Sequence, residues 1–473
     1  MAAGTMIRHR NVCYVIADGG PCIGCGVCAG ICPLGALNIA FNPYGEYNPQ
    51  EAPGVCTGCG MCHKVCPFGA SAENEDQIAA RRYRSLTGIQ WRAEVGFYLD
   101  SFAAYSQVDG HRANGSSGGV ATWILESLLA QGEVDHVCCV RATGKPDVLF
   151  NYAILDSQED VRSSSGSCYY PVELSSVVRH IKETPGRYAV VGLPCFLKAL
   201  RLAMVAASPL EQRIRHTVGL VCGQLQSKYY AHYLCELGGG DPLRLAHVRF
   251  RTKNHERPAN DYGFSFVCGN PDSEPARTLY WSQGVAEVWS MDYFTPEACL
   301  HCDDVFAEVA DVVLMDAWLP RYVADGRGTN LVITRSPYMQ ALLLDGARRG
   351  ELWVKPVGID DVIASQAGVL RRKRQELAYE LHTKTRRRSQ MWLPSKRVEP
   401  SGAVPVDVKL MFHLRRSIRL RAREAIVDGS SGSLVARIKV RTWWLRAVYR
   451  ALTWLLHHAS SVARTASETG GTR

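Results

Sequence analysis

The sequence predicts a mixed α/β (α+β) protein with a small cysteine-rich domain, a larger mixed α/β core and a basic, partly helical extension. Two cysteine runs of one spacing lie near the amino terminus, and short apolar strands alternate with helical segments between residues 97 and 348. Such interleaving is typical of α/β and α+β folds. The expected domains are residues 1–75, 93–350 and 371–473.

Two cysteine runs share the same spacing. They read Cys22-Ile-Gly-Cys25-Gly-Val-Cys28-Ala-Gly-Ile-Cys32-Pro33 and Cys56-Thr-Gly-Cys59-Gly-Met-Cys62-His-Lys-Val-Cys66-Pro67. A [4Fe-4S] cubane needs four thiolates, and in two-cluster ferredoxins the last cysteine of each run ligates the other cluster. We therefore expect a ferredoxin-like dicluster domain with one cluster on Cys22, Cys25, Cys28 and Cys66, and another on Cys56, Cys59, Cys62 and Cys32.

Zinc is the alternative ligand for these cysteines, because Cys-x-x-Cys pairs also build tetrahedral zinc sites. Zinc gives no reason for the third and fourth cysteine of each run, the fourth followed by Pro33 or Pro67. The residues from Met1 to Asp18 lack an apolar run followed by a small-residue cleavage site. We therefore expect reduced thiols and a cytoplasmic protein.

The net charge of +9 is unevenly distributed. Residues 371–473 contain 23 Lys and Arg against seven Asp and Glu, a balance of +16, so the preceding residues carry −7. No stretch reaches the roughly eighteen uninterrupted apolar residues of a membrane-spanning helix, and no span is expected.

Hydrophobic periodicity places the elements of the core. Strands are expected at residues 97–105, 134–140, 149–155, 188–192, 216–222, 248–253, 310–316 and 331–335. Helices are expected at residues 120–129, 172–182, 196–204, 229–236 and 338–348, the last of which should close the folded body. The Gly- and Pro-rich stretch 257–269 is expected to be a loop, and the stretches 371–388 and 392–406 to be linkers.

A loop of serine and glycine leads into the helix expected at Val120. Its last residues are Ser116, Ser117, Gly118 and Gly119. Free backbone N–H groups at a helix amino terminus suit a phosphate, although such loops are also plain helix caps.

Four further cysteines are candidates for a third cluster. Cys195 and Cys222 each follow an apolar strand, and Cys299 and Cys302 form a Cys-x-x-Cys pair. Strand ends in α/β sheets converge on ligand crevices. The alternative is that Cys195 and Cys222 are small buried hydrophobic residues. His301 is expected near the cluster or at the surface rather than as a ligand, and six cysteines are expected to be structural: Cys13, Cys138, Cys139, Cys168, Cys235 and Cys268.

The basic extension contains two segments of helical period, residues 408–426 and 434–458. In the second, Lys439, Arg446, Arg450 and His457 share one stripe, and apolar residues, three of them tryptophans, cover the remainder. This composition suits a helix in an anionic membrane interface, and it equally suits a helical hairpin packed on the body or on a partner. Binding to nucleic acid is the least supported alternative and is not expected.

Six short motifs resemble, in order, those of the family of coenzyme F420 hydrogenase/dehydrogenase beta subunits, over about residues 13–335. They are residues 112–119, Gly166-Ser167-Cys168-Tyr169, Gly192-Leu193-Pro194-Cys195, Val221-Cys222-Gly223, Cys299-x-x-Cys302-Asp303 and residues 311–316. The resemblance implies an FAD-binding core with its own [4Fe-4S] cluster on Cys195, Cys222, Cys299 and Cys302. It also implies FAD contacts by Ser116, Ser117, Gly118, Gly119, Ser167 and Tyr169.

The implied activity is that of an oxidoreductase that moves electrons between reduced coenzyme F420 and [4Fe-4S] clusters through FAD, with no catalytic acid, base or nucleophile. The implied partners are the deazaflavin coenzyme or a redox protein. Two alternatives are a ferredoxin-dependent reductase of a small organic substrate and a non-catalytic electron-relay subunit of a larger complex. One departure is Cys168, where members commonly carry lysine, so a positive contact to flavin or substrate is missing there.

Overall fold

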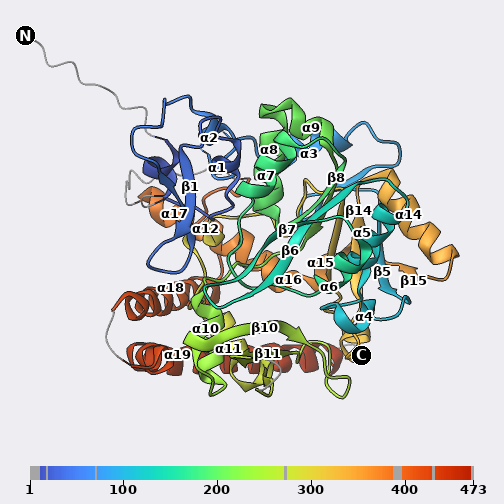
Figure 1. The fold of residues 1–473 in the computed structure, drawn as a ribbon. Helices are drawn as coiled ribbons and strands as arrows, with labels where there is room; N and C mark the ends of the chain where they lie inside the picture. Colours follow the sequence, from blue (N-terminus) through green and yellow to red (C-terminus); the bar gives the residue numbers. More distant parts are fainter. Residues whose placement is uncertain are drawn as a thin grey trace, which may run out of the picture.

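The computed structural model describes residues 11–17, 20–69, 72–270, 274–386, 397–428 and 432–469. A mixed eight-stranded sheet forms its centre. The cysteine-rich region lies at one end of this sheet, and two long helices run along another side of the molecule (Figure 1). The mixed α/β class, the small amino-terminal ferredoxin-like region and the C-terminal helices are thereby confirmed.

The central sheet has the strand order β15-β5-β14-β13-β9-β8-β6-β7. The neighbouring pairs β13–β9, β9–β8 and β8–β6 are parallel, whereas the outer strands pair antiparallel. The strands are β5 Asp100–Ser106, β6 His136–Lys145, β7 Val148–Leu155, β8 Tyr188–Gly192, β9 Ile214–Leu220, β13 Val312–Asp316, β14 Asn330–Thr334 and β15 Leu352–Pro356. No strand order was predicted, because pairing depends on contacts between distant segments.

Helices cover both faces of this sheet, since successive strand residues point to opposite sides. Val312 and Leu314 of β13 join a core with α5 Val120–Ala130 and α14 Pro337–Arg348. Val313 and Met315 join the opposite core, which includes α8 Pro194–Ala206 and the cysteine-rich region. The apolar runs of the parallel strands follow from burial on both faces.

The cysteine-rich region docks on the core through α7 Ser175–Glu183 and α8. It consists of α1 Val27–Ile31, α2 Met61–Lys64 and the hairpin of β1 Leu37–Phe41 and β2 Tyr47–Glu51. The backbone N–H of Leu174 donates to the carbonyl of Cys25 at 2.8 Å. A Cβ atom on Gly30 would lie 2.7 Å from the side chain of Val178, so α1 approaches α7 too closely for a larger residue.

The remaining short elements connect these layers. They are α3 Glu75–Tyr83, β3 Gln90–Arg92, β4 Gly96–Tyr98, α4 His111–Asn114, α6 Gln158–Ser163, α9 Ser208–Arg213, α10 Tyr229–Leu237, α11 Val285–Ser290, α12 Glu297–Leu300, α13 Pro320–Val323, α15 Ile359–Ser365 and α16 Ala367–Arg371. Single π- or 3-10-helical turns span Cys13–Ala17, Pro242–Arg244, Trp281–Gln283 and Arg372–Glu376.

A second, three-stranded sheet corrects the prediction of a loop at residues 257–269. It contains β10 Leu245–Thr252, β11 Gly263–Cys268 and β12 Arg277–Tyr280. Phe264 and Phe266 of β11 are buried on the same face and pack against the core. Pro258 precedes the strand, Gly263 begins it and Gly269 follows it, and these residues obscured its two-residue period.

The chain also remains folded beyond the helix that was expected to close the body. β15 pairs with β5 at the sheet edge. The predicted linker 371–388 is helical as far as it is described, through the π-helical turn Arg372–Glu376 and α17 Leu377–Arg386, and residues 387–388 lie outside the described residues. Lys373 and Leu377 are buried. In the second predicted linker, residues 392–396 lie outside the described residues, and Arg397 is buried among carboxylates. Charge composition misled here because the side chains of Lys373 and Arg397 lie inside the protein rather than in solvent.

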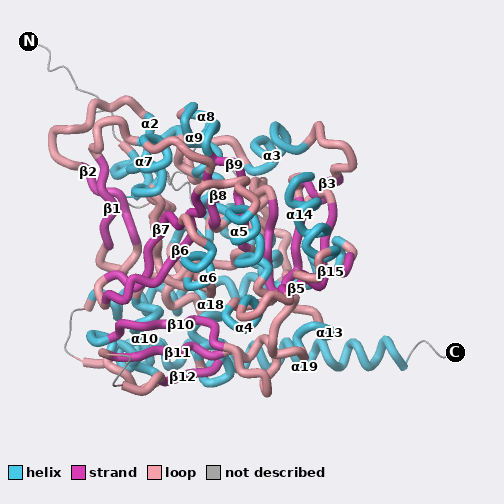
Figure 2. Tube along the Cα trace, turned by 45° about the vertical axis from the view of Figure 1, so that its right-hand side comes forward, coloured by secondary structure: helices cyan, strands magenta, loops and turns pink. Residues whose placement is uncertain are grey.

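The last two helices, α18 Val406–Val427 and α19 Leu434–Thr469, pack side by side. Arg446 lies 2.6 Å from Glu287 of α11, and the Tyr449 hydroxyl donates to the carbonyl of Ser290 at 3.3 Å. The hairpin is therefore packed on the body, and α19 projects past it (Figure 2). No helix of the described residues is both long enough and apolar enough to cross a bilayer.

Candidate redox site

The first cysteine set, defined as Cys22, Cys25, Cys28 and Cys66, borders one apolar cavity beside α1 and α2. Burial raises the pKa of the Cys28 thiol well above its ordinary value, and the other three cysteines raise it further. Burial also raises the pKa of Cys25 to about 11, and a hydrogen bond from the backbone of Val27 partly offsets this effect. Four converging thiols, an apolar wall and N–H donors to sulfur fit a [4Fe-4S] cluster.

Glycines shape the loop that carries this set. Gly24 and Gly26 have φ values of 71° and 77°, which side chains rarely adopt. A Cβ atom on Gly24 would lie 2.2 Å from the carbonyl oxygen of Tyr47, and one on Gly26 would lie 2.2 Å from a carboxylate oxygen of Glu173. The glycines therefore allow the loop to lie between the hairpin and α7.

The second cysteine set, defined as Cys56, Cys59, Cys62 and Cys32, is less enclosed. Burial raises the pKa of Cys62, and the charges of Cys56 and Cys59 add to this effect, so these three thiols are neighbours. Cys32 follows α1, and its sulfur accepts a hydrogen bond from the backbone of Ala36 at 3.3 Å. The proposed role of this set in a second cluster stays a prediction.

Cys13 lies beside the second cysteine set. This position was not predicted, because Cys13 is outside both cysteine runs. Burial is the main cause that raises the pKa of Cys13 to about 12, and the charges of Glu51, Cys62 and Cys56 raise it further. The charge of this thiol would therefore affect any metal bound by Cys62 and Cys56.

The third cysteine set, defined as Cys195, Cys222, Cys299 and Cys302, is brought together by the fold. Burial raises the pKa of Cys195 well above its ordinary value, and the charges of the other three members raise it further. The Cys299 sulfur accepts a hydrogen bond from the backbone N–H of Leu225 at 3.2 Å. Four thiols with a backbone donor again fit a [4Fe-4S] cluster.

The first and third cysteine sets are neighbours. Cys25 of the first set contributes to the raised pKa of Cys195 in the third. This proximity follows from the docking of α1 on α7 and α8, because Cys195 lies in the first turn of α8.

A lysine from the C-terminal extension faces the third cysteine set. The Lys373 ammonium donates to the carbonyl oxygen of Cys299 at 3.3 Å. Burial lowers the pKa of Lys373, but the charges of Cys302, Cys299, Cys222 and Cys195 outweigh burial and raise it overall. This lysine was not predicted, because it stands within a run of six charged or polar residues.

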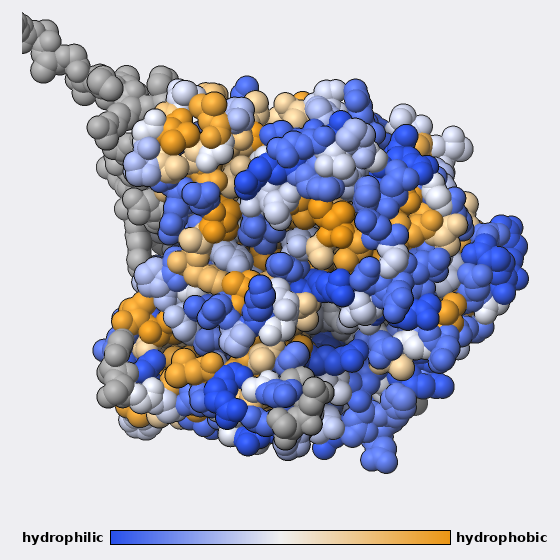
Figure 3. Space-filling view, viewed as in Figure 1, coloured by the Kyte–Doolittle hydropathy of each residue, from blue (hydrophilic) through white to orange (hydrophobic). Residues whose placement is uncertain are grey.

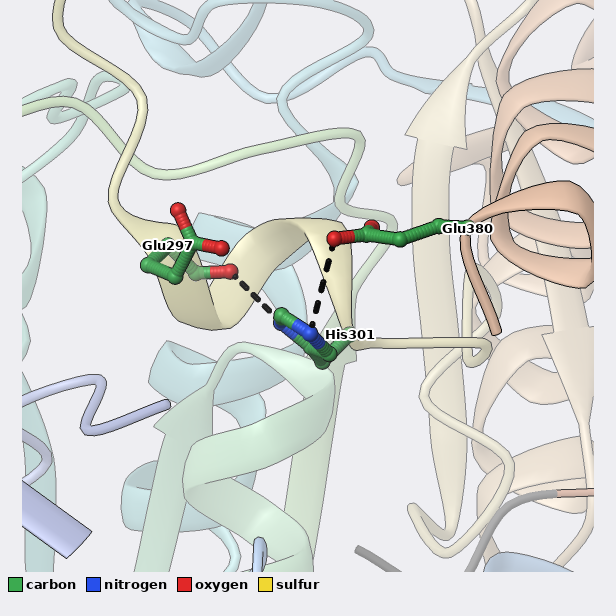
Figure 4. Close-up of side chains that lie close together, drawn as sticks. All are labelled: Glu297, His301 and Glu380. Atoms are coloured by element: carbon green, nitrogen blue, oxygen red, sulfur yellow. Dashed lines mark hydrogen bonds and ion pairs between the residues drawn. The ribbon is translucent and has the colours of Figure 1, made fainter. Parts of the chain in front are cut away.

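His301, between Cys299 and Cys302, is buried rather than at the surface. One ring nitrogen lies 3.1 Å from the carbonyl oxygen of Glu297, and the other lies 3.7 Å from the Glu380 carboxylate (Figure 4). Lys384 lies 2.8 Å from Glu380, and Arg419 lies 2.7 Å from Glu297. The two cations neutralise both carboxylates, so this group joins α12 to the extension without needing a metal ion.

A pocket opens where residues 251–262 meet the loop after β13, and its charged lining residues are Arg251, Lys253, Asp261 and Asp316. Its wall includes Ser116, Ser117, Arg251, Lys253, Asp316 and Gly328. Arg251 lies 2.5 Å from Asp316, and the Lys253 ammonium donates to the carbonyls of Arg112 and Ser117. Burial, then Arg251 and Arg112, lower the pKa of Lys253 to about 7. This donor set fits the diphosphate of a dinucleotide cofactor.

The predicted cofactor contacts divide into two groups. Ser116 and Ser117 line the pocket, and the backbone N–H of Ser167 donates to the Ser116 hydroxyl at 2.6 Å. Tyr169 reaches the pocket residues Arg251 and Tyr262.

The two glycines contact other parts of the fold. A Cβ atom on Gly118 would lie 2.6 Å from the carbonyl oxygen of Ala104, and one on Gly119, at φ 77°, would lie 2.5 Å from that of His111. They permit the close turn into α5, and their contact with FAD stays a prediction.

The pocket and the third cysteine set lie along one edge of the sheet. Asp316 ends β13, Cys222 follows β9 and Cys195 follows β8, and these three strands are parallel neighbours. Their carboxyl ends therefore share an edge. Trp289 lies between the pocket and the third cysteine set. Its ring centroid is 4.9 Å from that of Tyr169 on the pocket side. Its backbone carbonyl accepts a hydrogen bond from Gln224, which lines a cavity with Cys299.

Three family models match the chain. Residues 21–70 match the 4Fe-4S dicluster domain. Residues 101–179 match the amino-terminal model, and residues 186–359 the C-terminal model, of the coenzyme F420 hydrogenase/dehydrogenase beta subunit. These two models together match more than half of the chain.

Two curated proteins are similar to the chain. One subunit of the F(420)H(2) dehydrogenase of Methanosarcina mazei is 28% identical over 208 residues, covering 42% of this chain and 53% of that protein. The coenzyme F420-dependent sulfite reductase of Methanocaldococcus jannaschii is 26% identical over 312 residues, covering 63% of this chain and 42% of that protein. The chain thus spans about half the length of the curated relatives it matches.

Among solved structures, the F420-reducing [NiFe] hydrogenase complex of Methanosarcina barkeri, studied by xenon derivatization, contains a similar chain. The identity is 17% and the TM-score 0.49, covering 62% of this chain and 96% of that chain. On the two matched family models and the six motifs, the chain belongs to the family of coenzyme F420 hydrogenase/dehydrogenase beta subunits and carries an amino-terminal 4Fe-4S dicluster domain.

Proposed function

We propose that the protein is an iron–sulfur flavoprotein oxidoreductase that transfers electrons between reduced coenzyme F420 and [4Fe-4S] clusters through FAD. The main support is the succession of the pocket, the third cysteine set and the first cysteine set, with Trp289 between the pocket and the third set. Family membership and the F420-linked names of both curated relatives support the hydride donor. FAD, when bound, supplies the conversion of a two-electron hydride into single electrons.

In this proposal each part of the chain has one role. Residues 1–75 hold two clusters, residues 93–350 hold FAD and the third cluster, and the extension closes the third site. Arg251 and Lys253 bind the cofactor diphosphate. Tyr169 and Trp289 exclude water between the pocket and the third cysteine set.

The test is cofactor content followed by reaction with the donor. Oxygen-free preparations should contain FAD and about twelve irons per chain, at four irons per cubane. About eight irons would contradict the third cluster. Reduced F420 should then bleach the flavin absorbance. A flavin bleached by dithionite but not by reduced F420 would contradict the F420 assignment and favour a ferredoxin-dependent reductase or an electron-relay subunit.

We further propose that α19 contacts an anionic membrane surface, because its outward side is apolar while its sequence is basic. Trp443 and Trp454 are 68% and 58% exposed. The exposed apolar side chains follow helical spacing: Ala436, Val440, Trp443, Trp444, Ala447, Val448, Ala451, Trp454 and Leu455. Residues 429–467 contain six Lys or Arg and no Asp or Glu. Apolar side chains also gather around α18 and α19 at the lower left of Figure 3. Arg441 is paired with Asp428, and Arg446 and Arg450 with Glu287, so anionic lipid would complement the other cations.

Vesicle flotation tests this contact. The protein should float with vesicles containing phosphatidylglycerol and not with pure phosphatidylcholine vesicles, and Trp443→Gln with Trp454→Gln should abolish flotation. The control is Val205→Gln, at a 70% exposed valine of α8, which lies on the opposite side of the molecule from α19 (Figure 1). The contact would be contradicted if the tryptophan variant floated as well as the control variant, or if the unaltered protein did not float with anionic vesicles. The exposed apolar side of α19 would then be assigned to a redox partner protein.

A further inference from the structure

Lys373 is the buried cation of the third cysteine set. Its side chain is nearly enclosed, with 6% of the residue exposed. Its ammonium donates to the Cys299 carbonyl at 3.3 Å. It also lines the cavity bordered by Cys299 and Cys302. A lysine is almost never buried to this degree without a negatively charged neighbour.

The nearby carboxylates are committed to other cations. Asp292 lies 2.6 Å from Arg372, Glu376 pairs with Arg415, and Glu380 lies 2.8 Å from Lys384. Among the described residues, no carboxylate lies within 4.0 Å of the Lys373 ammonium. The negative groups that face Lys373 are therefore the thiolates of the third cysteine set.

The helix geometry directs Lys373 toward this set. The residue lies in the single π-helical turn Arg372–Glu376 between α16 and α17. The ion pairs of Arg372 with Asp292 and of Glu376 with Arg415 hold the turn at both ends. A π-helical turn within a helix is rare and is often found at functional sites.

We propose that Lys373 raises the reduction potential of the third cluster, so that the C-terminal extension tunes the electron relay. This inference rests on the proposed function, because it requires a [4Fe-4S] cluster on the third cysteine set. Each reduction of a cubane adds one negative charge, and a fixed positive charge in a poorly solvated site favours the reduced form. The matched family models end at residue 359, so this lysine comes from outside them.

The experiment is an anaerobic redox titration followed by EPR on the full, cofactor-loaded protein. The variants are Lys373→Met, which removes the charge at similar volume, Lys373→Gln, which keeps a donor, and Lys373→Arg, which keeps the charge. The matched control is Lys355→Met, at an exposed lysine of β15. Cys299→Ser identifies the EPR signal of the third cluster by its loss.

The midpoint potential of the third cluster should fall in Lys373→Met and Lys373→Gln and stay near the original value in Lys373→Arg and Lys355→Met. The first and second clusters should keep their potentials in all variants. An unchanged potential in both neutral variants with about twelve irons bound would overturn this inference alone. About eight irons in the unaltered protein would overturn the third cluster and this inference with it. If Lys373→Met does not fold, Lys373→Gln decides.

Discussion

Lys253 shows how one side chain reports on the ligand of its pocket. Its ammonium is surrounded by Arg251, Arg112 and backbone carbonyls, and burial together with these cations lowers its pKa to about 7. A bound diphosphate would reverse this balance, because an anion favours the protonated amine. Binding of FAD should therefore be coupled to uptake of a proton by Lys253.

The affinity for FAD should consequently fall as the pH rises above about 7, by at most about tenfold per pH unit for one coupled proton. Lys253→Arg should bind FAD with little dependence on pH between 6 and 9, since arginine stays charged. Lys253→Met should bind weakly at every pH. Fluorescence titration of the cofactor-free protein measures this, and an affinity of the unaltered protein that is constant from pH 6 to 9 would refute the role of Lys253.

The same lowered pKa affects the stability of the FAD-free protein. Between about 7 and the ordinary lysine value of 10.5, the unfolded chain binds a proton that the folded chain lacks. The contribution of Lys253 to the free energy of unfolding therefore increases as the pH rises through this range. Below about 7 both states are protonated and the burial cost is fully present.

Among the secondary-structure elements, the extension is joined to the core by Arg397. Its guanidinium lies 2.6 Å from Glu308 and 3.4 Å from Asp303, which are 0% and 1% exposed, and 3.2 Å from Asp76 of α3. Arg397 therefore neutralises carboxylates from two distant segments next to the third cysteine set. Removal of Arg397 takes the nearest cation away from the buried carboxylate of Glu308, which then has only the longer 3.7 Å pair with Arg374 among the ion pairs of the described residues.

Arg397→Met should lower the free energy of unfolding by about 3–5 kcal/mol. The matched control is Arg348→Met, because Arg348 is 75% exposed and its pair with Asp345 is at the surface. That variant should lose less than about 1 kcal/mol. Urea unfolding monitored by tryptophan fluorescence measures both, and equal losses would show that the buried cluster contributes nothing beyond a surface pair.

Elements with a local signature were predictable from the sequence. The strand β8 has the predicted bounds Tyr188–Gly192, because five apolar or small residues precede a Leu-Pro turn. The strand β11 and the helix α17 were not predicted. Nearby glycine and proline residues obscured the period of β11. The charged residues of α17 suggested an exposed segment, although Glu380 and Lys384 are buried as an ion pair.

Across the entire protein, the strand order decides which sites become neighbours. Adjacent ends of β13, β9 and β8 bring the pocket to the third cysteine set, and the docking of α1 brings the first set to the third. Spacing alone predicted the first and second cysteine sets; the members of the first border one cavity, and the second stays a prediction. The third set was a candidate from two strand ends and a Cys-x-x-Cys pair, and the family resemblance strengthened it, because Cys195 and Cys302 are more than one hundred residues apart along the chain. Lys253, Arg251 and Lys373 had no motif and needed the fold.

The proposed function requires that electrons pass from a bound hydride donor through flavin to the amino-terminal clusters of one chain. Rapid anaerobic mixing with reduced F420, followed by optical and EPR detection on frozen samples, resolves this path in time. We predict that the flavin absorbance falls first and that EPR signals of reduced clusters follow, with Cys299→Ser still bleaching its flavin but showing delayed cluster reduction. A flavin that bleaches while every cluster stays oxidised would show that no such path exists.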